Sequence, residues 1–373
     1  MQFENRNKKR YFMGILMLLG VVILWVGSSF LINSIFTEQS FDHPFFLTYF
    51  NTSTFSIYLI LVFFQRRYQK FKNKRVETSH KSPLVSPELN VNQYGLAKDL
   101  KLQDLTELNS EEEEEEEITT PSNNKLSDKE TAKLSFYFCL LWFAANWSNN
   151  ASLSLTSVAS STILSSTSGI FTLIFGSLFK VERFTLVKLS GILVSLLGVV
   201  LVGLSDMGTD SSLTFNTMVI GDILSILGAV FYAFYTTFLK IKVDEEKVDM
   251  KLFLGFVGLI NLVIMIPVMI LIHYINVEPF SFPPTSTVWA MLFLNAFFGT
   301  FLSDYLWIFA VLFTSPLVVT LGLSLTIPFA MVGDILINGK SITTIYGCGA
   351  LFVIIGFFMV NSVAYQETVN KRD

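Results

Sequence analysis

Ten stretches of this sequence are each long and apolar enough to cross a lipid bilayer. A bilayer core takes about 20 apolar residues per helix, and a spanning segment has to satisfy its own backbone hydrogen bonds. The predicted spans are 11–35, 45–64, 134–155, 157–179, 185–205, 218–239, 252–273, 288–312, 316–336 and 342–364. With 51% hydrophobic and only 15% charged residues, a soluble domain of this length is excluded. We therefore predict an all-α polytopic membrane protein with ten transmembrane helices.

The lysines and arginines indicate which side of the membrane each connection faces. When the N-terminus is placed in the cytoplasm, 25 of the 26 basic residues fall on the cytoplasmic side. Lys340 alone falls on the far side. Because the number of spans is even, both termini are predicted to be cytoplasmic.

The chain also carries an internal duplication, which aligns without a gap at a shift of 158 positions. Matched pairs include Asn146 with Asp304, Gly191 with Gly349 and Gly198 with Gly356. Each half, 11–205 and 218–364, holds five spans, so the second half enters the membrane from the opposite side. Two inverted five-helix repeats are typical of transporters, in which the halves exchange conformations.

The remaining segments are a cytoplasmic N-terminus at 1–10, a linker at 206–217, a cytoplasmic tail at 365–373 and a long insertion at 65–133. The insertion begins with the basic string RRYQKFKNKR and reaches seven consecutive glutamates. Its composition predicts a disordered, acidic cytoplasmic loop. The basic string suits anionic lipid headgroups or an ordinary positive-inside anchor. The acidic run suits a regulatory contact or a solvated linker.

No catalytic or metal-binding pattern is present. The three histidines form no ligand spacing with carboxylates or cysteines, and no nucleotide-binding or hydrolase motif occurs. There is no basic stripe for nucleic acid. We expect no enzyme activity, no metal and no cofactor. The expected partners are a small-molecule solute and the lipid bilayer, and the oligomeric state stays open.

The candidate site residues are polar groups inside the spans, because an ionisable group in a membrane is costly to bury. Asp304 is the deepest, and its repeat partner is Asn146. An aromatic residue follows each of them, Tyr305 and Trp147. The alternative is that Asp304 only hydrogen-bonds a hydroxyl of a neighbouring helix.

Further candidates are hydroxyl, amide and aromatic residues that either line a cavity or mediate close helix packing. They are Trp25, Ser28, Asn150, Ser165, Ser166, Phe231, Tyr235, Ser324 and Thr326. Pro328 removes a backbone donor within its helix and is a candidate hinge.

Three strings carry a family resemblance: WVGSSFLINSIF, ANWSNNASLSLTSVASSTILSSTSGIFTLI and LSDYLWIFAVLFTSPLVVTLGLSLTIPFAMVGD. The chain resembles the drug/metabolite transporter superfamily with its EamA-type repeat. Within it, the strings are similar to the fungal thiamine-repressible vacuolar-membrane proteins and the nucleotide-sugar-transporter-like solute carriers of the F subgroup. The resemblance implies a central cavity built from the first four helices of each half, with the fifth helices supporting it.

We therefore predict a secondary transporter of a small organic solute that works by alternating access. A carboxylate among aromatic rings suits a cationic solute, such as a thiamine-like compound, or else Asp304 carries a coupling proton. The alternatives are a membrane scaffold or receptor-like protein that moves no solute, and a nucleotide-sugar transporter. The resemblance implies the vacuolar membrane, with the Golgi or another endomembrane as the alternative.

Overall fold

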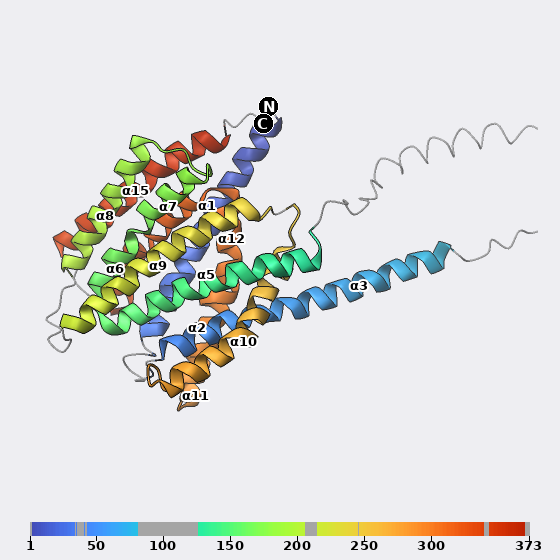
Figure 1. Cartoon of the computed structure of the whole chain (residues 1–373). Helices are drawn as coiled ribbons and strands as arrows, with labels where there is room; N and C mark the ends of the chain where they lie inside the picture. The colour runs from blue at the N-terminus through green and yellow to red at the C-terminus, as the bar shows by residue number, and fades with distance from the viewer. Residues whose placement is uncertain are drawn as a thin grey trace, which may run out of the picture. The chain divides into compact units, whose positions relative to one another are not determined.

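The computed structural model describes residues 2–33, 35, 41, 43–80, 126–205, 215–244, 246–338 and 343–369. All the elements in these ranges are helical, and those within residues 1–62 and 126–373 form a bundle (Figure 1). The first half comprises α1 (Gln2–Asn33), α2 (Pro44–Ser53), η2 (Thr54–Ser56), α3 (Ile57–His80), α5 (Asp128–Leu155), α6 (Val158–Ser166), α7 (Ser168–Leu178) and α8 (Leu186–Ser205). The second half comprises α9 (Phe215–Lys242), α10 (Met250–Tyr274), α11 (Ser286–Leu294), η3 (Asn295–Leu302), α12 (Ser303–Phe313), α13 (Pro316–Leu323), α14 (Thr326–Asn338) and α15 (Thr344–Val369).

The all-α polytopic membrane fold predicted from the sequence is confirmed. In the described ranges, nine continuous or broken helices are long and apolar enough to cross a membrane. The tenth predicted span is the apolar part of α5, which lies beside α9 and α10 in the bundle. It falls short of the same apolarity because Asn146, Asn149 and Asn150 lie within it. A helix packed among other helices tolerates such polar positions, because they face protein and not lipid.

The two halves pack on each other through matched helices. The fifth helices of the two halves, α8 and α15, lie along one another (Figure 1). A Cβ added to Gly198 would lie 2.5 Å from the carbonyl oxygen of Gly349, and one added to Gly356 would lie 2.5 Å from that of Gly191. Rising residue numbers on α8 therefore meet falling numbers on α15, so the two matched helices run antiparallel. Helix α1 packs along α12 in the same way that its counterpart α9 packs along α5.

The fourth helix of each half is broken at the same register. The first copy breaks between α6 and α7 at Thr167, and the second breaks between α13 and α14 at Ser324 and Leu325. A shift of 158 places Thr167 on Leu325. Pro328 lies in the first turn of α14, and the first copy has Ile170 in its place. The break therefore does not depend on proline, and whether Pro328 acts as a hinge stays a prediction.

The segments that flank the predicted spans are more helical than expected. Helix α3 continues to His80 and α5 begins at Asp128, so both ends of the predicted loop 65–133 are helical. Lysine, arginine and glutamine favour a helix, and Ser127 with Glu130 forms a capping box at the start of α5. Hydrogen bonds donated by Ser127 also lower the pKa of the Glu130 carboxyl.

Residues 2–10 of the predicted N-terminus and residues 365–369 of the predicted tail are helical too, because α1 begins at Gln2 and α15 runs to Val369. The middle of the loop, 81–125, and most of the linker, 206–214, lie outside the described residues.

Two compact units make up the chain. Residues 1–62 and 126–373 form the helix bundle, and residues 63–125 form the other unit.

Candidate functional site

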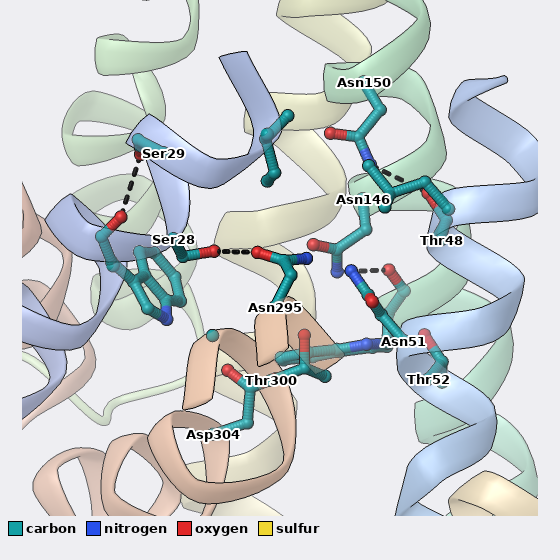
Figure 2. Close-up of a pocket in the computed structure, with 15 residues that line it drawn as sticks. Ser28, Ser29, Thr48, Asn51, Thr52, Asn146, Asn150, Asn295, Thr300 and Asp304 are labelled. Atoms are coloured by element: carbon teal, nitrogen blue, oxygen red, sulfur yellow. Dashed lines mark hydrogen bonds between the residues drawn. The ribbon is translucent and has the colours of Figure 1, made fainter. Parts of the chain in front are cut away.

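A polar cavity of about 190 Å³ lies inside the bundle (Figure 2). Its walls come from α1, α2 and α5 of the first half and from η3 and α12 of the second. The lining residues are Trp25, Ser28, Ser29, Ile32, Leu47, Thr48, Asn51, Thr52, Trp142, Asn146, Asn150, Asn295, Gly299, Thr300 and Asp304. The fifth helices α8 and α15 contribute none of them, in keeping with their supporting position.

The wall formed by α1 is tied to the second half by two hydrogen bonds. Ser28 Oγ donates to Asn295 Oδ1 at 2.5 Å, and Trp25 Nε1 donates to Ser303 Oγ at 3.1 Å. Gly299 permits this approach, because a Cβ there would lie 2.3 Å from Ser28 Oγ. The site therefore forms only where the two halves meet.

The opposite wall is a row of amides on α2 and α5 (Figure 2). Asn150 Nδ2 donates to Thr48 Oγ1 at 2.8 Å, and Asn146 Nδ2 donates to the carbonyl of Trp142 at 2.9 Å. The carbonyl oxygen of the Asn51 side chain is buried and has no hydrogen-bond partner among the described residues. These amides present both donors and acceptors to a solute.

Asp304 supplies the only ionisable side chain among the fifteen lining residues. It is 3% exposed, and its Oδ1 has no hydrogen-bond partner in the described part of the chain. The side-chain nitrogen of Asn295 is likewise unpartnered. Buried polar atoms are nearly always paired, so unpaired atoms around one cavity indicate a place for a polar ligand.

Five of the residues predicted from the sequence come together here: Trp25, Ser28, Asn146, Asn150 and Asp304. Sequence reasoning missed the wall formed by α2 and the contribution of Asn295 and Thr300. An available signal was the presence of amides, Asn51 and Asn295, in otherwise apolar spans.

The other predicted residues lie outside the cavity lining. Tyr305 stacks on Tyr58 with ring centroids 5.6 Å apart, and Trp147 packs against a cluster that contains Phe143. Each directly follows a cavity residue in its helix, and consecutive residues of a helix do not share a face. Tyr235 is buried behind the cavity with its ring centroid 5.2 Å from that of Trp142.

The remaining predicted residues belong to the core or to the helix breaks. Phe231 packs against the hydrophobic core, and Ser324 follows α13 at the break. Ser165 Oγ and Ser166 Oγ both donate to the carbonyl of Thr162, and Thr326 Oγ1 donates to that of Leu323. Hydroxyls that bond to their own helix in this way bend or end it.

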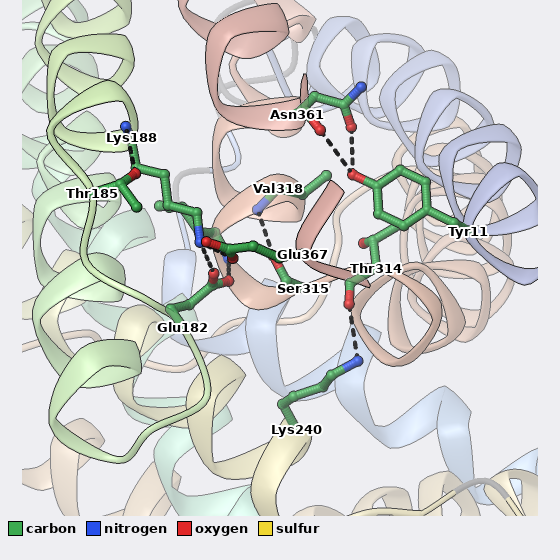
Figure 3. Close-up of polar contacts among 11 residues, drawn as sticks. Tyr11, Glu182, Thr185, Lys188, Lys240, Thr314, Ser315, Val318, Asn361 and Glu367 are labelled. Carbon is green, nitrogen blue, oxygen red and sulfur yellow. Dashed lines mark hydrogen bonds and ion pairs between the residues drawn. The ribbon is translucent and has the colours of Figure 1, made fainter. Parts of the chain in front are cut away.

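A second polar cluster lies away from the cavity, around the turn between α12 and α13 (Figure 3). Lys240 Nζ donates to the carbonyls of Val311, Leu312 and Thr314 at the end of α12, where backbone carbonyls have no partner within the helix. At the start of α13, Glu182 Oε1 accepts from the backbone N–H of Leu317 at 3.2 Å.

The same cluster holds a buried ion-pair network. Lys188 Nζ lies 2.8 Å from Glu182 Oε2 and 2.7 Å from Glu367 Oε2. Nearby, Tyr11 donates to the side chain of Asn361 at 2.7 Å and thereby joins α1 to α15. These contacts fasten together the ends of several helices on one side of the bundle.

Comparison with known proteins identifies the family. The model of the EamA-like transporter family matches residues 118–204 and 219–362, which is more than half of the chain. A solved crystal structure shares the fold with a TM-score of 0.60 at 12% identity, covering 94% of this chain and 98% of that one.

Three relatives align over nearly the whole chain. An uncharacterized vacuolar membrane protein of Saccharomyces cerevisiae is 40% identical, covering 98% of this chain and 93% of its own. A thiamine-repressible mitochondrial transport protein of the same yeast is 35% identical, covering 94% and 92%. Solute carrier family 35 member F5 of Mus musculus is 35% identical, covering 97% and 79%. The branch indicated by the sequence motifs is confirmed, and the chain belongs to the EamA-like transporter family.

Proposed function

We propose that this protein is a secondary transporter that carries a small organic cation by alternating access. The observation that carries the proposal is Asp304, a buried carboxylate with an unpartnered oxygen in a cavity that both halves build. None of the fifteen lining residues is a lysine, arginine or histidine, so a bound anion would have no countercharge there. A cation would pair with Asp304 and lie near the indole rings of Trp25 and Trp142, which also favour positive charge.

Alternating access is supported by the arrangement of the two halves. The antiparallel contact of α8 with α15 and the matching breaks in the fourth helices are features that both repeats share. If the halves exchange conformations, the cavity opens first to one side and then to the other. A second role for Asp304 rests on the same unpartnered oxygen: the carboxylate carries a coupling proton together with the solute.

The cavity also bears on the alternatives. A scaffold that moves no solute has no need of unpartnered polar atoms around an internal cavity. A nucleotide sugar carries two phosphate charges, and none of the lining residues would neutralise them. The volume of about 190 Å³ is below the 300–1,000 Å³ that is usual for drug-sized ligands.

The proposed location is the vacuolar membrane. It rests on the yeast relative at 40% identity, which is a vacuolar membrane protein, whereas the relative at 35% identity is mitochondrial. Fluorescence microscopy of the tagged chain together with vacuolar and mitochondrial markers decides between the two.

Uptake into vesicles reconstituted with the purified protein tests the function. The probes are thiamine and choline as cations, with a nucleotide sugar and a neutral sugar for comparison. We expect uptake of a cation, and we expect Asp304→Asn to reduce it at least tenfold, because the neutral amide loses the charge pairing (about 1.4 kcal/mol or more).

Asp222→Asn is the matched control. Asp222 is also a carboxylate within a predicted span, but it lies outside the cavity lining and accepts hydrogen bonds from Thr156 and Ser160 at 2.8 and 2.7 Å. Uptake by this variant should persist. Normal uptake by Asp304→Asn would assign Asp304 a packing role, and selective uptake of the nucleotide sugar would refute the charge argument.

A further inference from the structure

The π-helix η3 determines which side chains of its span reach the cavity. In an α-helix each residue turns the side-chain direction by about 100°. Asn295 and Asp304 are nine positions apart, so in a regular α-helix they would point about 180° away from each other. The structure nevertheless places both in the lining of one cavity (Figure 2).

The geometry of η3 resolves this difference. A π-helix closes its hydrogen bonds one residue later than an α-helix and turns about 82° per residue. Over the steps from Asn295 to Leu302 it removes about 130° of rotation and leaves Asn295 and Asp304 about 50° apart. Gly299 and Thr300 lie on the same face and line the same cavity. Short π-helical segments inside α-helices are frequent at functional sites, which fits this arrangement.

The contacts of Asn295 determine which end of its amide a solute meets. Asn295 is 1% exposed, and its Oδ1 accepts from Ser28 Oγ. Its Nδ2 is a buried donor without a partner among the described residues. The cavity therefore presents two unsatisfied groups on one helix face, an anionic acceptor on Asp304 and a neutral donor on Asn295.

We propose that Asn295 is a second recognition point and that the substrate is an organic cation bearing a hydrogen-bond acceptor, such as a hydroxyl, a carbonyl or a ring nitrogen. The inference rests on the proposed function, because Asp304 binds the positive charge. Asn295 Nδ2 donates to the acceptor. A cation that lacks the acceptor leaves this donor buried and unpaired, which costs about tenfold or more in affinity.

The test is uptake of matched pairs of cations into reconstituted vesicles. One pair is choline with propyltrimethylammonium, which has a methyl group in place of the hydroxyl. The other pair is 1-methylnicotinamide with 1-methyl-3-isopropylpyridinium, which replaces the carboxamide. The wild type should prefer the acceptor-bearing member of a pair by about tenfold or more.

Variants test whether Asn295 causes the preference for the acceptor-bearing cation. Asn295→Leu keeps the size of the side chain and should take up both members of a pair equally. Ser28→Ala, which removes the hydroxyl that orients the amide, should narrow the preference. Asn149→Leu is the control, because Asn149 is an amide on α5 that lies outside the cavity lining and whose Oδ1 is buried, and the preference should persist.

The possible failures are distinguishable. Equal uptake of both members by the wild type, or an unchanged preference in Asn295→Leu, overturns the role of Asn295 and leaves the cation transporter intact. Absence of uptake for all four cations overturns the proposed function and this inference with it. Size-exclusion chromatography of each variant in detergent shows whether it has folded.

Discussion

Lys188 is a lysine on α8 that is fully buried, with 0% of its surface exposed. Its charge is tolerated because Glu182 and Glu367 both lie within 2.8 Å of its ammonium nitrogen (Figure 3). Glu182 is itself only 6% exposed and also accepts from the backbone of α13. Removing one partner of a buried pair leaves the other as an uncompensated charge, which costs more than the pair contributes.

We predict that Lys188→Met destabilises the protein by about 3–5 kcal/mol, seen as a lower melting temperature in detergent. The control is Lys247→Met, because Lys247 pairs with Asp244 at 3.2 Å where both side chains are about half exposed. Such a surface pair contributes at most about 1 kcal/mol. Adding Glu182→Gln to Lys188→Met should restore part of the loss. A variant Lys188→Met that melts like the wild type would contradict the account.

At the scale of elements, the contact between α8 and α15 depends on how closely two backbones approach. In lipid, no hydrophobic driving force brings two helices together. Small residues stabilise their contact because they let the two backbones approach closely. A Cβ on Gly349 would lie 2.6 Å from the carbonyl oxygen of Gly198, an atom that cannot move without its helix. Gly347, two positions earlier on α15, has nothing within 4 Å of its added Cβ.

These two glycines make a matched pair for an experiment. Gly349→Ala should force the helices apart and cost about 1–3 kcal/mol. Gly347→Ala should leave the melting temperature unchanged or raise it slightly, because alanine favours a helix by up to about 1 kcal/mol over glycine. Equal melting temperatures for the two variants would show that the approach of the helices does not limit stability.

At the scale of the whole molecule, the cavity and the charged cluster lie toward opposite ends of the bundle. Trp25 and Ser28 lie in the last part of α1, whereas Tyr11, which bonds Asn361, lies in its first part. The basic residues predict that α1 begins at the cytoplasmic face. If that orientation holds, the helix ends joined by Lys240, Glu182 and their partners lie at the cytoplasmic end of the bundle.

Orientation is testable with sealed organelles. A specific protease site inserted between residues 100 and 101 should be cut by protease added from outside. The same site inserted within 339–342, beside the single far-side lysine, should be cut only after the membrane is permeabilised. Protection of the first site would overturn the predicted orientation.

Deleting 81–125 should leave insertion and localisation intact, because the repeats are complete without that segment.

The sequence by itself determined the spans, the repeat and the polar positions. Apolar length requires helices in a bilayer, and the duplication pairs Asn146 with Asp304. These features are local or periodic, so they can be read along the chain. The sequence predicts a loop over the whole of 65–133, but both ends of that segment are helical. Local helix propensity and the capping box at Ser127 extend α3 and α5 into it.

Only the tertiary structure decided which polar side chains share the cavity. Trp147 and Tyr305 lie next to site residues in sequence but turn away from them, whereas Asn51 comes in from α2. Asn295 joins Asp304 because η3 changes the helical phase, and no regular periodicity predicts that change. The physical reason is that helix packing selects the face each span presents, and a π-helix alters that face within a single span.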